Sequence, residues 1–228
     1  MQIIFVLVEP QVPENVGAAA RALKTMGFSK MRVVSSDAHR QPPARWLAHG
    51  AGDIIDRIET FSSLDAAVAD CALVVGTSAK LRSGHRQLYT PEQLAAKLPQ
   101  AGAASVALVF GREDRGLSNR ELESCELLTS IPLAVSYPSL NLGQAVMLYA
   151  YALSGVEAET RHIKPAKNAN AQREALKQRL AAQLDSLNYD ADSKLQQWAL
   201  ERVAGATAED VRFLHSLCAA LESRVGER

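Results

Sequence analysis

The chain has 228 residues, enough for one α/β domain of ordinary size and a small additional module. An apolar content of 47% indicates a packed core and excludes an intrinsically disordered chain. The 25 basic residues balance 25 acidic ones, so the net charge excludes a general attraction to nucleic acid, and any such binding must rest on local patches.

The cysteines and the N-terminal segment indicate where the protein works. Cys71, Cys125 and Cys218 form no CxxC pair, and neither they nor the five histidines have the spacing of metal ligands. We therefore expect reduced, mostly buried thiols, a cytoplasmic protein and no metal ion. The apolar run Ile3–Val8 is too short for a signal peptide or a membrane span, which predicts a soluble protein without a membrane partner.

Apolar runs and helix signals alternate along the first two thirds of the chain. Strands are expected at Ile3–Val8, Met31–Val34, Ala72–Gly76, Val106–Phe110 and Leu127–Ile131. Helices are expected at Pro13–Met26, with Gly27 as its stop, at Ser63–Ala69 and at Pro91–Lys97. This alternation predicts an α/β fold with a mostly parallel sheet.

A further helix is expected from Asn141 to about Ala158, and it has no polar face. Its residues 145–153 are all apolar or aromatic, and a helix of this kind must be buried. In so small a chain, this favours a subunit interface over a wholly internal position. Three amphipathic helices are expected beyond it, at Gln172–Leu187, Ser193–Val203 and Ala208–Glu222. We therefore expect a domain of residues 1–158, a polar linker of 159–171 and a helical module of 172–228.

Two segments carry local positive charge. The first, Arg161–Arg179, has six Lys or Arg residues against Glu174 alone, a net charge of +5. The second cluster consists of Lys80, Arg82, His85 and Arg86 and contains no acidic residue. Such patches suit phosphate binding, although a solvated linker and helix face explains each of them equally well.

The first of three informative motifs is Asn15-Val16-Gly17-Ala18-Ala19-Ala20-Arg21. Helical side chains lean toward the preceding turn, so Arg21 should lie over Gly17 and Ala18 and leave space for a ligand beside a fixed cation. Asn15 is expected at an N-cap position, where it can cap the helix or offer its amide to a substrate. A capped helix with an exposed arginine is the alternative interpretation.

The second motif, Phe110-Gly111-Arg112-Glu113-Asp114-Arg115-Gly116-Leu117, follows a predicted strand. The spacing of Gly111 and Gly116 is similar to that of a phosphate-binding loop, but the Lys-Ser/Thr pair that must follow is absent, which argues against a nucleotide triphosphatase. Gly111 lets another group approach the backbone. Glu113 is an anion that can hold a nearby arginine or a loop amide.

The third motif, Pro138-Ser139-Leu140-Asn141-Leu142, precedes the apolar helix, and both Ser139 and Asn141 are natural helix caps. No Ser-His-Asp or Cys-His arrangement is present, and the Gly-x-Gly-x-x-Gly fingerprint of dinucleotide-binding enzymes is absent.

In this order and at these separations, the three motifs resemble those of the SPOUT RNA methyltransferases. Within that superfamily the chain resembles the SpoU (TrmH) branch, and most of all its TrmJ/LasT-like group of tRNA/rRNA ribose methyltransferases. The resemblance covers roughly residues 1–155. It implies an α/β sheet with a C-terminal trefoil knot, formed from about Thr77 to Ala158, and a homodimer in which each active site borrows from the partner.

The resemblance also implies a role for each motif. Asn15 and Arg21 correspond to the Asn and Arg of the family's first motif, Glu113 would organise the site, and Ser139 and Asn141 would face the substrate. The donor S-adenosyl-L-methionine would be held by Thr77, Ser78, Ala79, Gly111, Ile131, Pro138, Ser139 and Leu140. The family usually has a small aliphatic residue or Met and then Ser or Ala after the Asn, so Leu142-Gly143 is a mild departure.

The implied reaction is methylation of a ribose 2′-hydroxyl in structured RNA, with tRNA favoured and rRNA as the alternative. A guanidinium stays protonated, so we expect Arg21 to bind a phosphate and favour the developing alkoxide while Ser139 or a water relays the proton. The rival hypotheses are a non-catalytic RNA-binding protein of the same fold, an RNA base methyltransferase, and a small-molecule α/β enzyme.

Overall fold

The computed structural model describes residues 1–78, 87–135, 139–160, 169–189 and 193–225. Its strands form one sheet in the order β3-β2-β1-β6-β4-β7-β5, and every described pair is parallel. The strands are β1 (Gln2–Val8), β2 (Met31–Val34), β3 (Glu59–Phe61), β4 (Leu73–Thr77), β5 (Leu88–Tyr89), β6 (Ser105–Phe110) and β7 (Leu127–Thr129). The mostly parallel α/β sheet is thus confirmed, and the knot stays a prediction.

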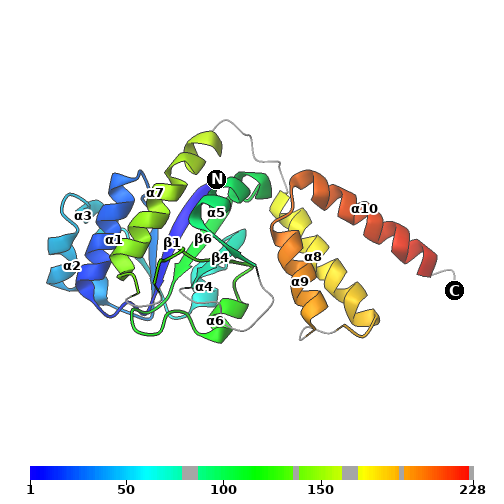
Figure 1. The fold of residues 1–228 in the computed structure, drawn as a ribbon, viewed down its shortest axis with the longest axis horizontal. Helices are drawn as coiled ribbons and strands as arrows, with labels where there is room; N and C mark the ends of the chain where they lie inside the picture. The colour runs from blue at the N-terminus through cyan, green and yellow to red at the C-terminus, as the bar shows by residue number, and fades with distance from the viewer. Residues whose placement is uncertain (79–86, 136–138, 161–168, 190–192, 226–228) are drawn as a thin grey trace.

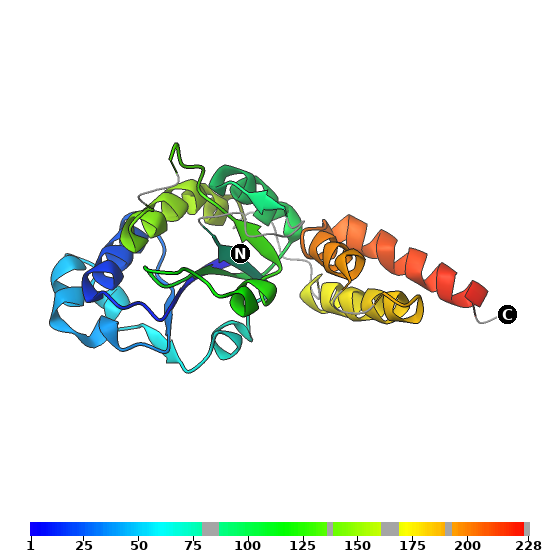
Figure 2. The same cartoon turned by 60° about the horizontal axis from the view of Figure 1, so that its bottom comes forward.

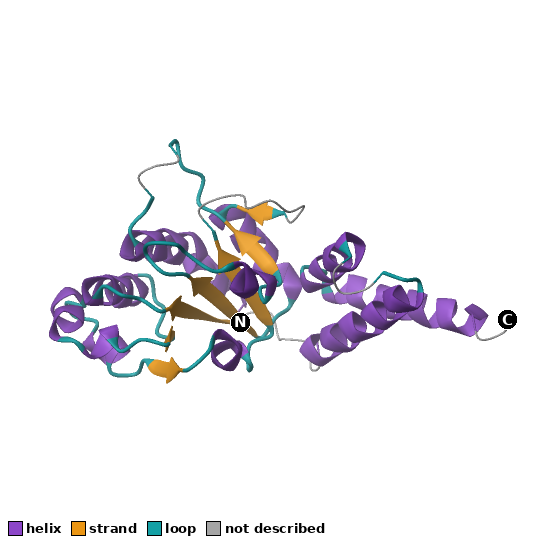
Figure 3. Cartoon of the chain, turned by 90° about the horizontal axis from the view of Figure 1, so that it is seen from below, coloured by secondary structure: helices purple, strands orange, loops and turns teal. Residues whose placement is uncertain are grey.

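Strand β1 shows why the sheet is covered on both faces. Ile3, Phe5 and Leu7 point into one apolar core, whereas the alternate residues Ile4, Val6 and Val8 point into a second. The larger core lies under α1 (Pro13–Thr25), α3 (Gly52–Ile55), α5 (Pro91–Ala101) and α7 (Leu142–Thr160), and the smaller one under α4 (Leu64–Val68) and α6 (Asn119–Glu123). Figure 1 shows α1, α7 and α5 over one face, and Figure 3 shows helices on both sides of the strands.

Several short elements were not anticipated from the sequence. They are β3, β5, α3, α6, α2 (Pro42–Leu47) and the 3-10 turn η1 (Ala38–Arg40). Each is six residues or fewer, too short to show a hydrophobic period. Helix α5 is also four residues longer than expected. Its Thr90–Gln93 capping box fixes the start, and it continues to Ala101, where Gly102 ends it by adopting a left-handed conformation with a φ of 62°.

The small residues of the first motif serve helix packing, which corrects the expectation that they leave space for a ligand. A Cβ added to Gly17 would clash with the backbone carbonyl of Ala44 in α2. On the other side of α1, a Cβ added to Gly143 would lie 2.8 Å from the Cβ of Ala18. Helix α1 is therefore held closely between α2 and α7 by the absence of side chains at these positions.

Three helices follow, α8 (Ala169–Ser186), α9 (Lys194–Ala204) and α10 (Ala208–Val225), and they have a small core of their own. Figure 2 shows them extending away from the sheet beyond α5. The core of these helices consists of Leu176, Val203, Val211 and Cys218, and Ala204 of α9 joins the larger core under the sheet.

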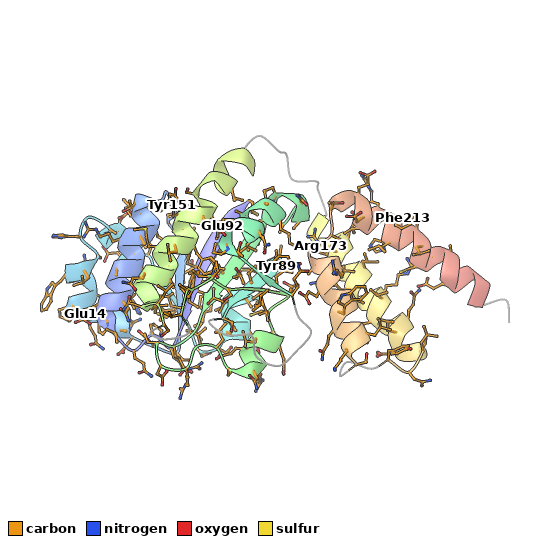
Figure 4. The ribbon with its side chains drawn as sticks, in the orientation of Figure 1. Glu14, Tyr89, Glu92, Tyr151, Arg173 and Phe213 are labelled. Atoms are coloured by element: carbon orange, nitrogen blue, oxygen red, sulfur yellow. The ribbon has the colours of Figure 1, made fainter. Side chains whose placement is uncertain are left out.

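In the described half of the Arg161–Arg179 segment, three basic side chains contact groups of the same chain, which favours the structural alternative, and RNA contact by the segment stays a prediction. Arg173 is 2% exposed and donates to the carbonyls of Ala101, at the end of α5, and Ala206. Figure 4 shows it at the junction between the C-terminal helices and the sheet domain. Two further basic residues of this segment form ion pairs, Lys177 with Glu126 and Arg179 with Glu222. Arg161, Lys164, Lys167 and the Lys80, Arg82, His85 and Arg86 cluster lie outside the described residues.

Candidate active site

A cavity of about 430 Å³ lies at the carboxyl ends of β4, β6 and β7, the edge at which parallel sheets place ligands. Its walls come from the second and third motifs, from the residues after β4 and β7, and from the first turns of α7. The lining residues are Thr77, Ser78, Phe110, Gly111, Arg112, Glu113, Asp114, Arg115, Gly116, Leu117, Ile131, Leu133, Ser139, Leu140, Leu142, Ala145 and Tyr149.

The sequence-predicted donor residues gather here. Six of them line this one cavity: Thr77, Ser78, Gly111, Ile131, Ser139 and Leu140, together with Glu113, the expected organiser of the site. They come from four separate segments of the chain, which the strand order β6-β4-β7 brings together. Ala79 and Pro138 lie outside the described residues.

The floor of the cavity is apolar and fixed by hydrogen bonds. The Phe110 ring meets Tyr149 of α7 edge-on, with ring centroids 5.6 Å apart. Tyr149 is 1% exposed and donates to Thr129 Oγ1 at 3.1 Å, and Thr129 in turn donates to the Tyr89 carbonyl at 2.7 Å. Burial raises the pKa of the Tyr149 hydroxyl, so it remains a proton donor within this network at neutral pH.

The loop of the second motif folds back on itself above this floor. Arg112 and Gly116 form a small antiparallel bridge, in which the Gly116 N–H donates to the Arg112 carbonyl at 2.9 Å. A Cβ added to Gly111 would clash with the backbone of Gly116 and Leu117. Gly111 was expected to let another group approach the backbone, and that group is the backbone of the same loop. Gly116 has a φ of 69°, a conformation that favours glycine.

Arg112 anchors this loop and was not singled out by the sequence analysis. Its guanidinium is buried and donates to Glu9 Oε2 at 2.7 Å and to Glu121 Oε2 at 2.9 Å. Glu9, at the end of β1, has a φ of 45°, an uncommon conformation for a residue with a side chain. The sequence marks Glu121 only as the end of the Ser118–Glu121 capping box of α6, and no local pattern links Arg112 to Glu9, 103 residues away.

The Glu9–Arg112 pair makes the unfolding free energy of the protein depend on pH in the acidic range. The hydrogen bond from Arg112 is the main reason that the pKa of Glu9 lies below its ordinary 4.5. Stability from this pair is therefore complete above about pH 4.5 and is lost as the pH falls through the lowered value. We expect Glu9→Gln to flatten the fall in unfolding free energy between about pH 5 and pH 3, measured by urea denaturation. The control Glu14→Gln, at an exposed position, should leave the slope unchanged, and an equal flattening in both variants would contradict the assignment.

Glu113 ties the second motif to the first. Its carboxylate accepts hydrogen bonds from the backbone N–H groups of Gln11 and Val12, at 3.1 and 3.2 Å, and from Asn15 Nδ2 at 3.0 Å. Val12 is the N-cap residue of α1, and Asn15 lies buried in the first helical turn. This corrects the expectation that Asn15 caps the helix. An anion from a different loop supplies the N-terminal acceptor instead.

Asn141 extends this connection to the third motif. Its Nδ2 donates to Asn15 Oδ1 at 2.7 Å, and its Oδ1 accepts from the N–H of Gly143 at 2.8 Å. The Gln144 side chain accepts from the Asn141 N–H at 3.2 Å, so the start of α7 is capped as expected. A chain of side-chain hydrogen bonds, Glu113–Asn15–Asn141, therefore joins all three motifs. Of these three, only Glu113 is among the described residues that line the cavity.

Arg21 lies elsewhere. Arg21 is exposed on α1. It lies one turn after Gly17, which packs on α2. It also lies three residues before Lys24, which pairs with Asp53 of α3 at 2.7 Å. These positions share one helix face, so Arg21 lies on the side of α1 that carries α2 and α3. It is not among the described residues that line the cavity. The expectation that Arg21 stands beside the ligand is not met within one copy of the chain.

Comparison with known proteins agrees with this arrangement of motifs. The SpoU rRNA Methylase family model matches residues 2–151, about two thirds of the chain. The chain belongs to this methyltransferase family. A second model, the C-terminal domain of the tRNA/rRNA methyltransferase LasT, matches residues 170–225.

Individual relatives cover the SpoU-type region or the whole chain. An Escherichia coli protein called an uncharacterized tRNA/rRNA methyltransferase, LasT, is 43% identical over 99% of both chains. The tRNA (cytidine/uridine-2′-O-)-methyltransferase TrmJ of Pectobacterium atrosepticum is 44% identical over 64% of this chain and 61% of its own length. The structure of the SpoU methyltransferase AviRb from Streptomyces viridochromogenes with AdoMet shares the fold, with a TM-score of 0.54 and 20% identity over 69% of this chain and 61% of that one.

Within the described residues, no three His, Cys, Asp or Glu side chains gather as metal ligands would. Among the described helices, none combines the length and apolar character that crossing a membrane requires.

Proposed function

We propose that this SpoU-family methyltransferase transfers a methyl group from S-adenosyl-L-methionine to a ribose 2′-hydroxyl of structured RNA, with tRNA as the favoured class. The observation that carries the proposal is the Glu113–Asn15–Asn141 chain, which joins the three motifs at the wall of one cavity. The name of the related TrmJ, a tRNA 2′-O-methyltransferase, supports the acceptor and the RNA class.

The cavity suits the donor in size and chemistry. A volume of about 430 Å³ lies within the usual range for small-molecule sites, and an apolar floor with polar groups at the strand ends is their usual composition. Thr77, Ser78, Gly111, Ile131 and Leu140 would hold the donor, which supplies a methyl group on a positively charged sulfur. Glu113 and the exposed face of Ser139 would then border the acceptor.

The protein's contribution to catalysis is alignment. Holding the acceptor oxygen in line with the methyl group can supply about 7–11 kcal/mol of the barrier. Because a guanidinium stays protonated, Arg21 binds an RNA phosphate and favours the developing alkoxide rather than acting as a base. Ser139, or a water beside it, relays the hydroxyl proton to solvent, passing one proton on as it receives another.

This role for Arg21 requires a second copy of the chain, so we propose a homodimer. Helix α7 carries an exposed apolar stripe, with Leu148 41% and Tyr151 69% exposed in one chain. Figure 4 shows Tyr151 on the outer side of α7. Covering this stripe with a partner would let each cavity receive Arg21 from the other copy. The trefoil knot from about Thr77 to Ala158 and a cytoplasmic location belong to the same proposal.

Labelled methyl transfer tests the chemistry. The protein is incubated with labelled S-adenosyl-L-methionine and bulk tRNA or rRNA, and the RNA is hydrolysed with alkali. A methylated 2′-oxygen cannot attack the neighbouring phosphate, so label is expected in alkali-resistant dinucleotides from tRNA. Label only in mononucleotides would move the chemistry to the base, and no transfer with intact donor binding would indicate a binding protein.

Mixed dimers test the shared site. Arg21→Lys is expected to lower methyl transfer at least tenfold with unchanged donor affinity, because lysine cannot reproduce the planar fork of donors. Arg21→Ala is then co-expressed with a variant that cannot bind donor. In a mixed dimer, the cavity of the Arg21→Ala chain receives Arg21 from the other chain, so one of the two sites is complete. Half of the dimers are mixed, so about a quarter of wild-type activity should be recovered. Near-normal turnover of Arg21→Lys, or no recovery in the mixture, would contradict the proposal.

A further inference from the structure

A second cavity, of about 520 Å³, lies among η1, α2 and α3 and has no part in the site described above. Its chemistry comes from His39, Arg40, Arg45, Trp46 and Asp56. In Figures 1 and 2, α2 and α3 lie at the end of the molecule opposite to α8–α10, so this cavity is also separate from the C-terminal helices.

Trp46 is the outstanding feature of this cavity. Trp46 is 69% exposed. The six-residue helix α2 buries Ala44 against α1 and leaves Trp46 at the surface. The neighbouring Leu47 is 43% exposed, so the ring belongs to an open apolar surface. An exposed indole beside cations is the platform on which single-stranded nucleic acids stack their bases.

His39 provides a buried polar group without a partner. The residue is 6% exposed, and its Nδ1 has no hydrogen-bond partner among the described residues. Burial, with the nearby charge of Arg40, lowers the pKa of His39, so the ring is neutral at pH 7. A neutral imidazole offers one donor and one acceptor nitrogen, which suits the edge of a base. Buried polar groups are rarely left unsatisfied, so an ordered water or the edge of a bound base would complete the contacts of His39.

The charges around the cavity favour a phosphate at its rim. Arg40 is exposed and close enough to His39 to affect its pKa. Arg45 is paired with Asp56, and both side chains are more than half exposed. A phosphate can displace this exposed carboxylate from Arg45 or bind Arg40 beside it.

The cavity also lies next to the arginine of the first motif. Gly17 of α1 packs directly on Ala44 and Leu47 of α2, and Arg21 follows Gly17 by one helical turn on the same face. One polynucleotide strand can therefore contact the Trp46 surface and Arg21 together.

From these features we propose that the cavity among η1, α2 and α3 binds an unpaired nucleotide of the RNA substrate. The base stacks on Trp46 with its edge toward His39, and its phosphate meets Arg40 and Arg45. This inference deepens the proposed function and rests on it. The recognised RNA feature is an unpaired base beside the one that is methylated, so duplex RNA should not occupy this cavity.

Tryptophan fluorescence isolates the contact, because the chain has only two tryptophans, Trp46 and Trp198. In full-length Trp198→Phe, a single-stranded oligouridylate of about twelve nucleotides should quench the Trp46 emission in a salt-dependent manner. A duplex of the same length should not. Trp46→Phe, which reports Trp198, serves as the matched control. Quenching confined to Trp198 would overturn the inference. A change of Trp46 emission with protein concentration in the absence of RNA would overturn it in favour of a protein partner.

Steady-state kinetics separates this inference from the proposed function. Trp46→Ala should raise the KM for unmodified tRNA about tenfold with kcat and donor affinity little changed. Trp46→Phe should have a smaller effect, because a ring remains. If wild-type protein methylates tRNA and Trp46→Ala does so with the same KM, the cavity is not an RNA site. If wild-type protein transfers no methyl group while Trp46 is still quenched by RNA, the proposed reaction fails and the site stands.

Discussion

Glu113→Ala is expected to reduce methyl transfer about a hundredfold while leaving a folded protein. The carboxylate accepts three hydrogen bonds that fix the start of α1, and Asn15 then positions Asn141. Without it, the amides of Gln11 and Val12 and the side chain of Asn15 lose their acceptor, at a cost of about 1–3 kcal/mol in unfolding free energy. The three motifs are then no longer held together.

The measurement combines initial rates of methyl transfer with urea denaturation. Glu123→Ala removes a carboxylate from an exposed position of α6 and is the matched control, expected to change neither quantity. Glu113→Gln should lie between the two, because one oxygen remains as an acceptor. Wild-type rates in Glu113→Ala would show that the hydrogen-bonded chain does not organise the site.

Gly111→Ala is expected to abolish measurable donor binding and to destabilise the protein by about 3 kcal/mol or more. The added Cβ would meet the backbone of Gly116 and Leu117, which cannot rotate away as a side chain could. The small bridge between Arg112 and Gly116 must then open, and with it the cavity wall.

Calorimetric titration with donor and thermal denaturation measure the two effects. Gly52→Ala is the matched control, because the added Cβ would lie 3.2 Å from the end of the flexible Arg45 side chain, which can move away. It should leave donor affinity unchanged and change the unfolding free energy by less than about 1 kcal/mol. Unchanged donor affinity in Gly111→Ala would remove this loop from the binding site.

The sequence indicated part of this cavity because Ser78 and Gly111 follow directly after the buried strands β4 and β6. Runs such as Val106–Phe110 are easy to recognise, and parallel strands bring their carboxyl ends to one edge. Gly111 and Ser139 both line the cavity, and their contact with the donor stays a prediction.

Contacts between distant segments escaped the sequence for a physical reason. Asn15 was expected to cap its own helix, but the acceptor comes from Glu113, 98 residues away. The positive charge around Arg173 suggested an RNA surface, yet a charge can be satisfied by a carbonyl or carboxylate from anywhere in the fold. The local sequence pattern indicates which helix or strand a residue belongs to, whereas the hydrogen-bond partner of its side chain depends on tertiary packing.

The position of β1 inside the sheet, between β2 and β6, has a consequence for synthesis. Residues 2–7 of this strand pair with 105–110 of β6, about a hundred residues later in the chain. At roughly 5–20 residues per second, the ribosome needs about 5–20 s to deliver that partner. During this interval the apolar side chains of β1 have no completed core, and closing so long a loop is slow compared with local pairing. The nascent chain must therefore remain unaggregated until the second motif has been made.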